Sequence, residues 1–185
     1  MKKVYIYLAN GFEEVEAITP IDFLRRAGAD VTTVAVGKKL TVTGSHGIDV
    51  LADKMIEDID VNDADMIVLP GGFPGYQNLA VNNTLTTHID AMIKSGRLVG
   101  AICGAPAAIL GNRGYLEGKK ATCYPGMEDM LTGAVVCTDS VCVDGNVITS
   151  RSTGTATDFA MALVKVLLGE GEYTKLKKAV VLDVK

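Results

Sequence analysis

"LVGAICGAPAAIL" (residues 98–110) joins a β-strand to a helix at a cysteine, and the rest of the fold can be worked out from this junction. The apolar run 98–102 is typical of a buried strand, and the small residues after Cys103 favour a helix. A nucleophile elbow is a sharp strand-to-helix turn whose strained backbone requires small neighbours. The neighbours that meet this requirement are Ala101, Gly104 and Ala105. The pattern predicts that Cys103 is a nucleophile at an elbow; the alternative is a buried structural cysteine that precedes a helix by chance.

The helix start behind Cys103 also predicts how the thiol behaves. A helix N-terminus carries partial positive charge, which favours a thiolate, so we expect a thiol pKa below the ~8.5 of a free cysteine. Free backbone N–H groups at the same place can receive an oxyanion or an oxidised sulfur. The Gly71-Gly72 turn ends a neighbouring strand and is expected to add another N–H donor.

Strands and helices alternate on both sides of this junction. Strands are expected at 4–9, 30–37, 64–72 and 97–103, and helices at 13–29, 82–96, 104–114 and 153–171. Short strand-like pieces in 41–52 are expected at an edge of the sheet, and a hairpin is expected at 143–146. Near-continuous apolar strands between helices predict an α/β fold, with a mainly parallel sheet covered by helices on both faces, in one domain over 1–185.

Active sites in such folds lie at the carboxyl ends of the strands, because the connecting loops meet there. Four segments of the chain follow a predicted strand in this way: Ala9–Glu16, Pro70–Gly75, Cys103–Pro106 and Ser150–Gly154. We expect the functional side chains to come from these loops.

The segment "GFEEVE" (11–16) places three carboxylates just beyond the first strand. Glu16 shares a helix face with Phe12 and Pro20, so it is expected to be partly buried, with a raised pKa, and able to hold a proton beside a thiolate. Glu13 and Glu14 are expected to face water, since glutamates are common in a first helical turn for dipole reasons alone. The helix is expected to kink or restart at Pro20 and to bury the following residues: Val15, Ile18, Ile21, Phe23 and Leu24.

Composition narrows the class of protein. The chain has 185 residues, a net charge of −4 and no strongly basic stretch, which argues against a nucleic-acid partner because phosphate binding needs clustered Lys and Arg. The apolar run near the N-terminus is too short for a signal peptide, and no stretch approaches the ~18 apolar residues of a membrane span. We therefore expect a cytoplasmic protein with no membrane partner.

The cysteines and histidines give little sign of a metal or disulfide framework. Cys123, Cys137 and Cys142 lie in apolar surroundings and are expected to be small buried side chains. No Cys/His cluster has metal-ligand spacing, and no phosphate-loop or dinucleotide-binding motif occurs, so no cofactor is expected. His88 lies within a predicted helix and is expected to have a solvated or capping role.

Four motifs together resemble the ThiJ/PfpI superfamily, in its small branch that contains the Parkinson-disease-associated deglycase: "GFEEVEA", "VLPGG", "AICGAP" and "TSRSTGTATDFA". The resemblance covers nearly the whole chain and implies a flavodoxin-like three-layer sandwich and a homodimer. It also implies that Cys103 is the reactive thiol, that Glu16 is its protonated partner, and that the amides of Gly72 and Gly104 form an anion hole.

The chain departs from that family at two positions. Gly104 follows the cysteine where the protease-like branch has a histidine, and Tyr124 stands where the deglycase relative has a site histidine. Tyr124 can donate a hydrogen bond but is a poor base near pH 7. His46 aligns with an arginine that reaches the partner subunit's site in close relatives; the alternative is that it fills a turn. Arg26 is a candidate second cation near the pocket, with a surface charge as the alternative.

Two functions of different kinds remain open. The first is cysteine-dependent, cofactor-free glyoxalase or deglycase chemistry on methylglyoxal or a related small reactive carbonyl. The second is a peroxide-responsive redox sensor or chaperone that uses the same oxidisable cysteine. A cysteine peptidase or amidotransferase is less favoured, because it needs a positioned histidine that the sequence does not provide.

Overall fold

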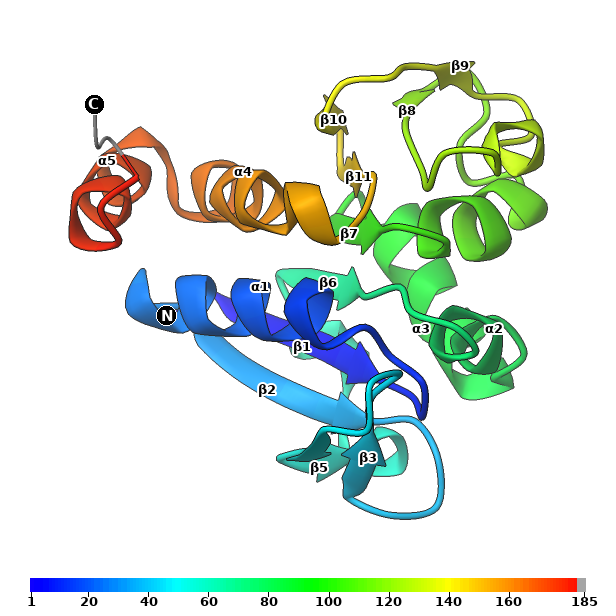
Figure 1. The fold of residues 1–185 in the computed structure, drawn as a ribbon, viewed down its shortest axis with the longest axis horizontal. Helices are drawn as coiled ribbons and strands as arrows, with labels where there is room; N and C mark the ends of the chain where they lie inside the picture. Colours follow the sequence, from blue (N-terminus) through cyan, green and yellow to red (C-terminus); the bar gives the residue numbers. More distant parts are fainter. Residues whose placement is uncertain (183–185) are drawn as a thin grey trace.

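A computed structural model describes residues 1–182 and shows one central seven-stranded sheet (Figure 1). The strand order is β10-β11-β7-β6-β1-β2-β5, and every neighbouring pair is parallel except β10 with β11. The strands are β1 (Lys3–Leu8), β2 (Asp30–Ala35), β5 (Lys54–Met55), β6 (Met66–Leu69), β7 (Leu98–Ile102), β10 (Val141–Asp144) and β11 (Val147–Ser150). The predicted strands and the hairpin at 143–146 are confirmed.

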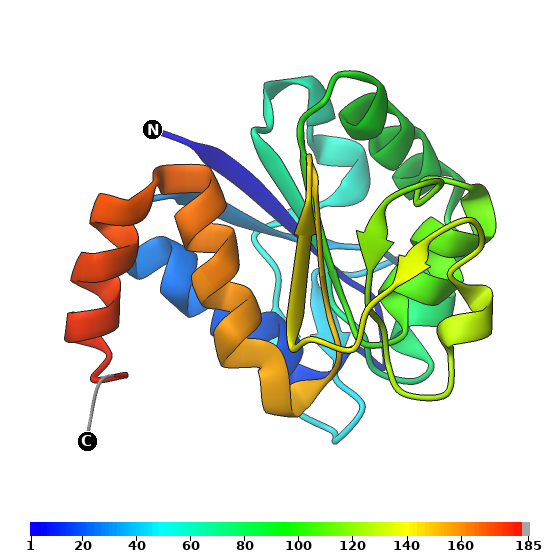
Figure 2. The same cartoon turned by 90° about the horizontal axis from the view of Figure 1, so that it is seen from above.

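Helices cover both faces of this sheet, so the fold has three layers (Figure 2). One face packs against α1 (Glu14–Arg26) and α4 (Ala156–Leu168), with α5 (Glu170–Ala179) beside them. The other face packs against α2 (Gly75–Ala80), α3 (Asn83–Lys94), a π-helical turn (Pro106–Leu110) and a 3-10 turn (Gly111–Arg113). The predicted α/β sandwich is confirmed, although the helix expected at 104–114 is a π turn followed by a 3-10 turn.

Alternation along the strands explains the two layers. In β1, Val4, Ile6 and Leu8 lie in the cluster under α1 and α4, whereas Tyr5 and Tyr7 lie in the cluster under α3. Successive side chains of a strand point to opposite faces, so a strand buried on both sides must be apolar throughout. This is why the strand cores form unbroken apolar runs in the sequence.

The short pieces of chain do not lie where the sequence indicated. β3 (Thr41–Thr43) and β4 (Asp49–Leu51) form a separate antiparallel pair and are not an edge of the main sheet, whose edges are β5 and β10. A second small pair joins β8 (Lys120–Ala121) to β9 (Val135–Val136). The remaining 3-10 turns are Ile56–Asp58, Val61–Asp63, Glu128–Met130 and Thr153–Thr155. Within residues 1–182, no helix has the length and apolar character needed to cross a membrane.

Helix α1 is continuous through Pro20, and its buried face differs from the expected one. Val15 and Ile18 are 45% and 41% exposed, whereas Glu14 and Glu16 are buried. The burial of Glu16 was expected, but the expectations for Glu14, Val15 and Ile18 were wrong, because they ranked side chains by polarity alone. Each buried carboxylate accepts hydrogen bonds from another loop, and burial of a charged group is tolerated when such partners exist.

The cysteines outside the elbow also differ from expectation. Cys123 is buried with a free thiol, as predicted, but Cys137 and Cys142 are joined by a disulfide. The loop between β9 and β10 turns back on itself and brings the two sulfurs together. A separation of five residues gives no sign of this in the sequence, because a turn of the right shape is needed as well.

His88 is buried in the core, so its predicted solvated or capping role was wrong. Its Nδ1 lies 2.9 Å from the hydroxyl of Tyr7, across the interface between α3 and β1. Burial lowers the pKa of His88, because a charged imidazole is poorly solvated there.

We expect this histidine to make the fold sensitive to acid. The unfolded chain binds the His88 proton more tightly than the folded one, so the stabilisation is complete above the unfolded pKa of ~6.5 and is lost as pH falls through the folded pKa. Urea unfolding at pH 8 and pH 5 should show a smaller acid loss in His88→Gln, which keeps an acceptor for Tyr7.

His46 provides the control for this measurement. Its pKa is raised by Glu14, so its contribution has the opposite sign: it is present below ~6.5 and is lost as pH rises through the folded pKa. His46→Gln should therefore not reduce the acid loss. An equal acid dependence in wild type and His88→Gln would contradict the assignment to His88.

Candidate active site

Cys103 occupies a strained turn between β7 and the helical segment after it. Its φ is 66°, and Val181 is the other non-glycine residue with positive φ in the part of the chain described. Backbone bonds fix the turn on both sides: the Cys103 N–H donates to the Ser150 carbonyl at 3.1 Å, and the Tyr124 N–H donates to the Cys103 carbonyl at 2.8 Å. A left-handed cysteine is costly unless its surroundings impose it, and it is a frequent mark of function. The predicted elbow is confirmed.

Two glycine amides donate to the Cys103 sulfur, those of Gly72 and Gly104. Gly72 has a φ of +90°, and a Cβ there would overlap the Glu13 amide. A Cβ on Gly104 would lie 2.8 Å from the ring of Tyr76. Glycine is therefore required at both positions by the close approach of other chain segments. The two donors converge on one point, as an anion hole needs.

Glu16 is the carboxyl group of the site, and it has no exposed surface. One oxygen accepts from the Gly71 amide at 3.0 Å, and the other lies 3.5 Å from the Thr153 hydroxyl. The carboxyl group also forms a hydrogen bond with the Cys103 side chain. Burial, followed by the charge of Glu13, raises the pKa of Glu16 to about 7. The side chain can thus hold or release a proton near neutral pH.

The thiol does not have the low pKa that the helix start suggested. Burial raises the pKa of Cys103, and an ionised Glu16 raises it further, to about 12, against the lowering effect of the Gly72 and Gly104 amides. The expectation considered the helix dipole and omitted burial. Because Glu16 and Cys103 are in contact, their protons are coupled. A proton on Glu16 removes the repulsion and leaves the two amides to stabilise a thiolate.

Gly71 lies between these two side chains, a packing role that the sequence did not indicate beyond the N–H donor expected from the Gly71-Gly72 turn. A Cβ on Gly71 would lie 2.5 Å from Glu16 Oε2 and 2.9 Å from Cys103 Sγ. We expect Gly71→Ala to separate the pair and to slow alkylation of Cys103, at an overpacking cost of ~1–3 kcal/mol in unfolding free energy. Iodoacetamide kinetics and thermal unfolding measure the two effects. Gly171→Ala in α5, where a Cβ meets nothing within 4 Å, is the control. Unchanged alkylation in Gly71→Ala would contradict this packing.

Glu14 does not face water; it binds His46. Its two oxygens lie 2.7 Å from the His46 amide and 2.8 Å from His46 Nδ1. Burial alone would raise the pKa of Glu14, but the bonds from His46 outweigh it and lower the pKa to about 2. The His46 side chain is 69% exposed, and its Nδ1 lies within hydrogen-bond distance of Glu14 and Ser45. Its role at a partner subunit's site stays a prediction.

The other two pocket candidates lie in different places. Tyr124 is 47% exposed, and the hydrogen bond from its backbone N–H to the Cys103 carbonyl places it beside the elbow. Arg26 ends α1, ten residues from Glu16 and so ~15 Å along the helix, and its Nε donates to Asp22 at 2.6 Å. Arg26 is a surface charge, and its expected place near the pocket was wrong.

Thr153 reaches the site, although its sequence fits a helix N-cap equally well. Ser152 is the capping residue, which leaves the Thr153 hydroxyl free to approach Glu16. The signal that favours Thr153 is its position just after β11, in one of the four loops at the carboxyl ends of the strands.

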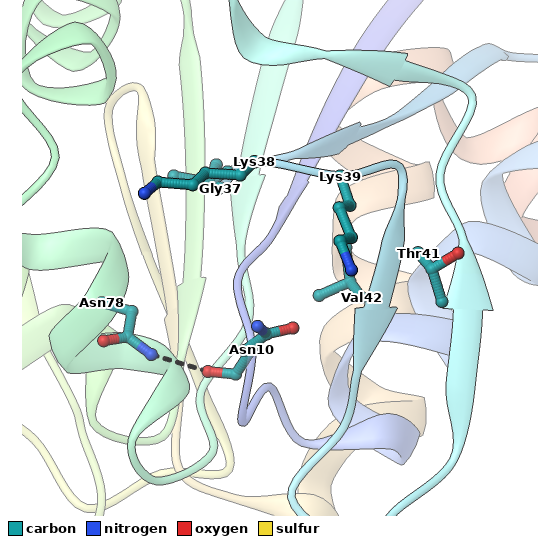
Figure 3. Close-up of a pocket in the computed structure, with 8 residues that line it drawn as sticks. Asn10, Gly37, Lys38, Lys39, Thr41, Val42 and Asn78 are labelled. Atoms are coloured by element: carbon teal, nitrogen blue, oxygen red, sulfur yellow. Dashed lines mark hydrogen bonds between the residues drawn. The ribbon is translucent and has the colours of Figure 1, made fainter.

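A separate hollow of about 490 Å³ lies at the carboxyl ends of β1 and β2 (Figure 3). Lys38, Lys39, Asn10 and Asn78 line it, and the Asn78 side chain donates to the Asn10 carbonyl at 2.8 Å. Neither Cys103 nor Glu16 contributes to its walls. The site is therefore assigned from the chemistry of the elbow and not from the size of a cavity.

Two groups of side chains place potential metal ligands within 4.8 Å of one another: Glu13, Glu14 and His46, and Cys137, Asp139 and Cys142. In the first group Glu14 and His46 already bond to each other, and in the second the two sulfurs are joined. Both groups have partners without an ion, so the geometry gives no support for a metal.

The fold is an α/β sandwich with a cysteine at a strained strand-to-helix turn and a buried carboxyl beside it. The model of the DJ-1/PfpI family matches residues 2–166. The chain belongs to the DJ-1/PfpI family, which confirms the resemblance found in the four sequence motifs.

Individual relatives agree with this assignment. Protein DJ-1 homolog B of Arabidopsis thaliana is 42% identical over 182 residues, which are 98% of this chain and 42% of that protein. The Parkinson disease protein 7 homolog of Danio rerio is 34% identical, over 98% of this chain and 97% of that protein. A Pyrococcus abyssi protein named a deglycase is 35% identical, over 89% of this chain and 99% of that protein. The chain spans less than half the length of the two Arabidopsis relatives.

The fold agrees as well. The solved structure of oxidised DJ-1 from Toxoplasma gondii superimposes with a TM-score of 0.94 at 34% identity and covers 98% of both chains. The layers and the sheet are therefore those of this family.

Proposed function

We propose that the protein is a cysteine-dependent, cofactor-free enzyme of the glyoxalase or deglycase type, acting on methylglyoxal or a related reactive carbonyl. The observation that carries the proposal is the buried pair of Cys103 and Glu16, in which the carboxyl has a pKa of about 7. A group poised near neutral pH can transfer a proton in both directions. The name of the Pyrococcus abyssi relative supports the deglycase class.

The positions of Cys103, Glu16 and the two glycine amides support conversion of a 2-oxoaldehyde to a 2-hydroxy acid. The Cys103 thiolate adds to the aldehyde carbon of a 2-oxoaldehyde, and the new oxyanion takes the Gly72 and Gly104 amides as donors before it is protonated. Glu16 supplies the proton to this oxyanion, and the carboxylate so formed then removes the proton from the same carbon. It returns this proton to the adjacent carbon through an enediol, while the hydroxyl proton moves from the first oxygen to the second, which gives a thioester. Water hydrolyses the thioester, so lactate leaves and the Cys103 thiol is restored.

The test is conversion of methylglyoxal to lactate by purified protein, with no added thiol or metal. The expected result is turnover that follows protein concentration and is abolished by prior alkylation of Cys103. Absence of turnover on methylglyoxal, phenylglyoxal and a glycated peptide would refute the enzymatic proposal.

A second candidate, a peroxide-responsive protein or chaperone, is favoured by the same donors. The amides of Gly72 and Gly104 can stabilise a sulfinate on Cys103 as well as an oxyanion. The Toxoplasma gondii structure is of an oxidised DJ-1, which concerns that protein. Peroxide titration followed by mass spectrometry tests this candidate: two added oxygen atoms on the Cys103 peptide are expected before any on Cys123.

The geometry gives little support to a peptidase or amidotransferase. Both histidines are engaged elsewhere in the described chain, His88 with Tyr7 in the core and His46 with Glu14 at the surface. Such an enzyme needs an imidazole that bonds to the nucleophile.

We also infer a homodimer, which the family resemblance implied. Val15 and Ile18 of α1 are exposed apolar residues, and Glu14 of the same helix bonds to His46 in the β3–β4 turn, where Ile48 is 58% exposed. An exposed apolar surface of this kind is typical of an interface. Sedimentation velocity should show a dimer in the wild type and a monomer in Ile18→Glu. Val81→Glu, at a 77% exposed site after α2, should remain dimeric. A monomeric wild type would contradict the inference.

A further inference from the structure

The disulfide between Cys137 and Cys142 takes part in no step of the proposed chemistry. It closes a loop between β9 and β10. Cys142 is 6% exposed and Cys137 is half-buried. Residues 138–140, which follow Cys137 in the loop, are exposed. The less buried sulfur, that of Cys137, is therefore the one that a solvent molecule can reach first.

A hollow of about 290 Å³ lies against this disulfide. Both cysteines line it, together with Asp139 and the exposed Lys120. A hollow of this size admits a small molecule, and Lys120 and Asp139 give its wall one charge of each sign. The disulfide is thus open to a small charged thiol and is not sealed in the core.

The loop closed by the disulfide is bonded to the end of β11. The Ser140 carbonyl accepts from the Ser150 hydroxyl at 2.7 Å, and the Thr138 carbonyl accepts from Arg151 Nη1 at 2.8 Å. Both acceptors lie between the two cysteines, so their positions depend on the closed loop.

The same end of β11 supports the active site. The Ser150 carbonyl accepts the Cys103 N–H at 3.1 Å, and three residues further on the Thr153 hydroxyl lies 3.5 Å from Glu16. One continuous set of contacts therefore runs from the disulfide loop, through residues 150–153, to both members of the Cys103–Glu16 pair.

We propose that Cys137 and Cys142 form a second redox site, which undergoes thiol–disulfide exchange with small-molecule thiols. The oxidation state of this pair determines how firmly residues 150–153 are held beside Cys103. In the oxidised form, the closed loop holds its two carbonyls against Ser150 and Arg151. In the reduced form the loop is released and this support weakens.

The exchange needs two equivalents of a small-molecule thiol, and glutathione is an example of this class. The first thiolate attacks Cys137 Sγ; the S–S bond breaks, and Cys142 leaves as a thiolate and takes up a proton. A second thiolate attacks the external sulfur of the mixed disulfide, which releases Cys137 and forms the small-molecule disulfide. Two electrons pass from the two thiols to the protein, and the reverse reaction oxidises it.

Reduction is expected to leave the fold intact. The cysteines are only five residues apart, and closing so short a loop restricts the unfolded chain far less than a long one does. The loop takes in only the first two residues of the edge strand β10, and the other six strands and the buried residues of both apolar layers lie outside it. The effect of reduction should therefore be local to the loop and to the segment that it holds.

The first experiment counts thiols across a series of glutathione redox buffers. After denaturation and alkylation, mass spectrometry should find two alkylated cysteines, Cys103 and Cys123, at the oxidised end and four at the reduced end. The change should occur in a single two-electron transition. The proposal would be overturned if Cys137 and Cys142 were alkylated at every buffer ratio, or if they were protected at every ratio.

The second experiment follows hydrogen exchange of residues 149–155 in the oxidised and reduced wild type and in a Cys137→Ser/Cys142→Ser variant. Both loop-open forms should exchange about tenfold faster in this segment than the oxidised protein, with α3 unchanged. Cys123→Ser, which alters a buried cysteine outside the loop, should match the wild type. Equal exchange in all forms would overturn the coupling to the site. Neither readout uses turnover, so the result is separate from that of the proposed enzymatic function.

Discussion

Replacing Cys103 by serine is expected to reduce methylglyoxal turnover by at least ~10³-fold, because the hydroxyl is a far weaker nucleophile near neutral pH. Serine fits the elbow, since it is smaller than cysteine and the strained backbone is held by bonds to Ser150 and Tyr124. The fold should therefore be retained, which circular dichroism and thermal unfolding can verify. Lactate formation under steady-state conditions measures the effect.

Cys123→Ser is the matched control for this prediction. Cys123 is the second free cysteine of the described chain; it is buried, whereas Cys103 is partly exposed, and its Sγ lies 3.4 Å from the Tyr124 carbonyl. Its replacement should leave turnover nearly unchanged. If Cys103→Ser keeps most of the turnover, or if Cys123→Ser loses as much, the thiol at the elbow is not the nucleophile.

Replacing Glu16 by glutamine is expected to reduce turnover by ~10²–10⁴-fold, the usual contribution of a positioned acid–base group. A glutamine oxygen can still accept from the Gly71 amide, so the loop should keep its shape. Without a titrating carboxyl beside the sulfur, the rate of Cys103 alkylation should lose its dependence on pH near 7.

Glu13→Gln separates position from general acidity. Glu13 accepts from the Glu16 amide at 2.7 Å and caps α1, a bond that glutamine can also form. We expect a much smaller loss of turnover than in Glu16→Gln. Equal losses in the two variants would show that the negative charge of the segment matters and not the carboxyl next to Cys103.

The Glu16 carboxyl also has a signature in stability. The folded protein holds this proton more tightly than the unfolded chain, so the stabilisation is complete below ~4.5 and is lost as pH rises through about 7. A shift from 4.5 to about 7 corresponds to about 3 kcal/mol of unfolding free energy. Denaturant titrations at pH 5 and pH 8 should show this contribution as a difference between two proteins: on going from pH 5 to pH 8, the wild type should lose about 3 kcal/mol more unfolding free energy than Glu16→Gln does.

Much of the molecule could be predicted from the sequence alone. Strand cores are apolar on both faces, and the small residues around Cys103 allow a sharp turn, so the sheet, its helices and the elbow follow from local patterns. Because loops meet at the carboxyl ends of parallel strands, the strand order alone predicts that Glu16, Gly72 and Cys103 lie at one edge of the sheet. The strands, the helices and the elbow depend on residues close to one another in the chain, whereas the meeting of the loops follows from the parallel order of the strands.

Tertiary structure decided the features that depend on partners from distant segments. Glu14 and Glu16 are buried while Val15 and Ile18 are exposed, because His46 and Gly71 supply hydrogen bonds that the helix itself does not contain. The high pKa of the thiol has the same origin, since burial and an adjacent carboxyl come from other elements. Hydrophobic periodicity is a local property, whereas the free energy of burying a charge depends on which groups the fold places against it.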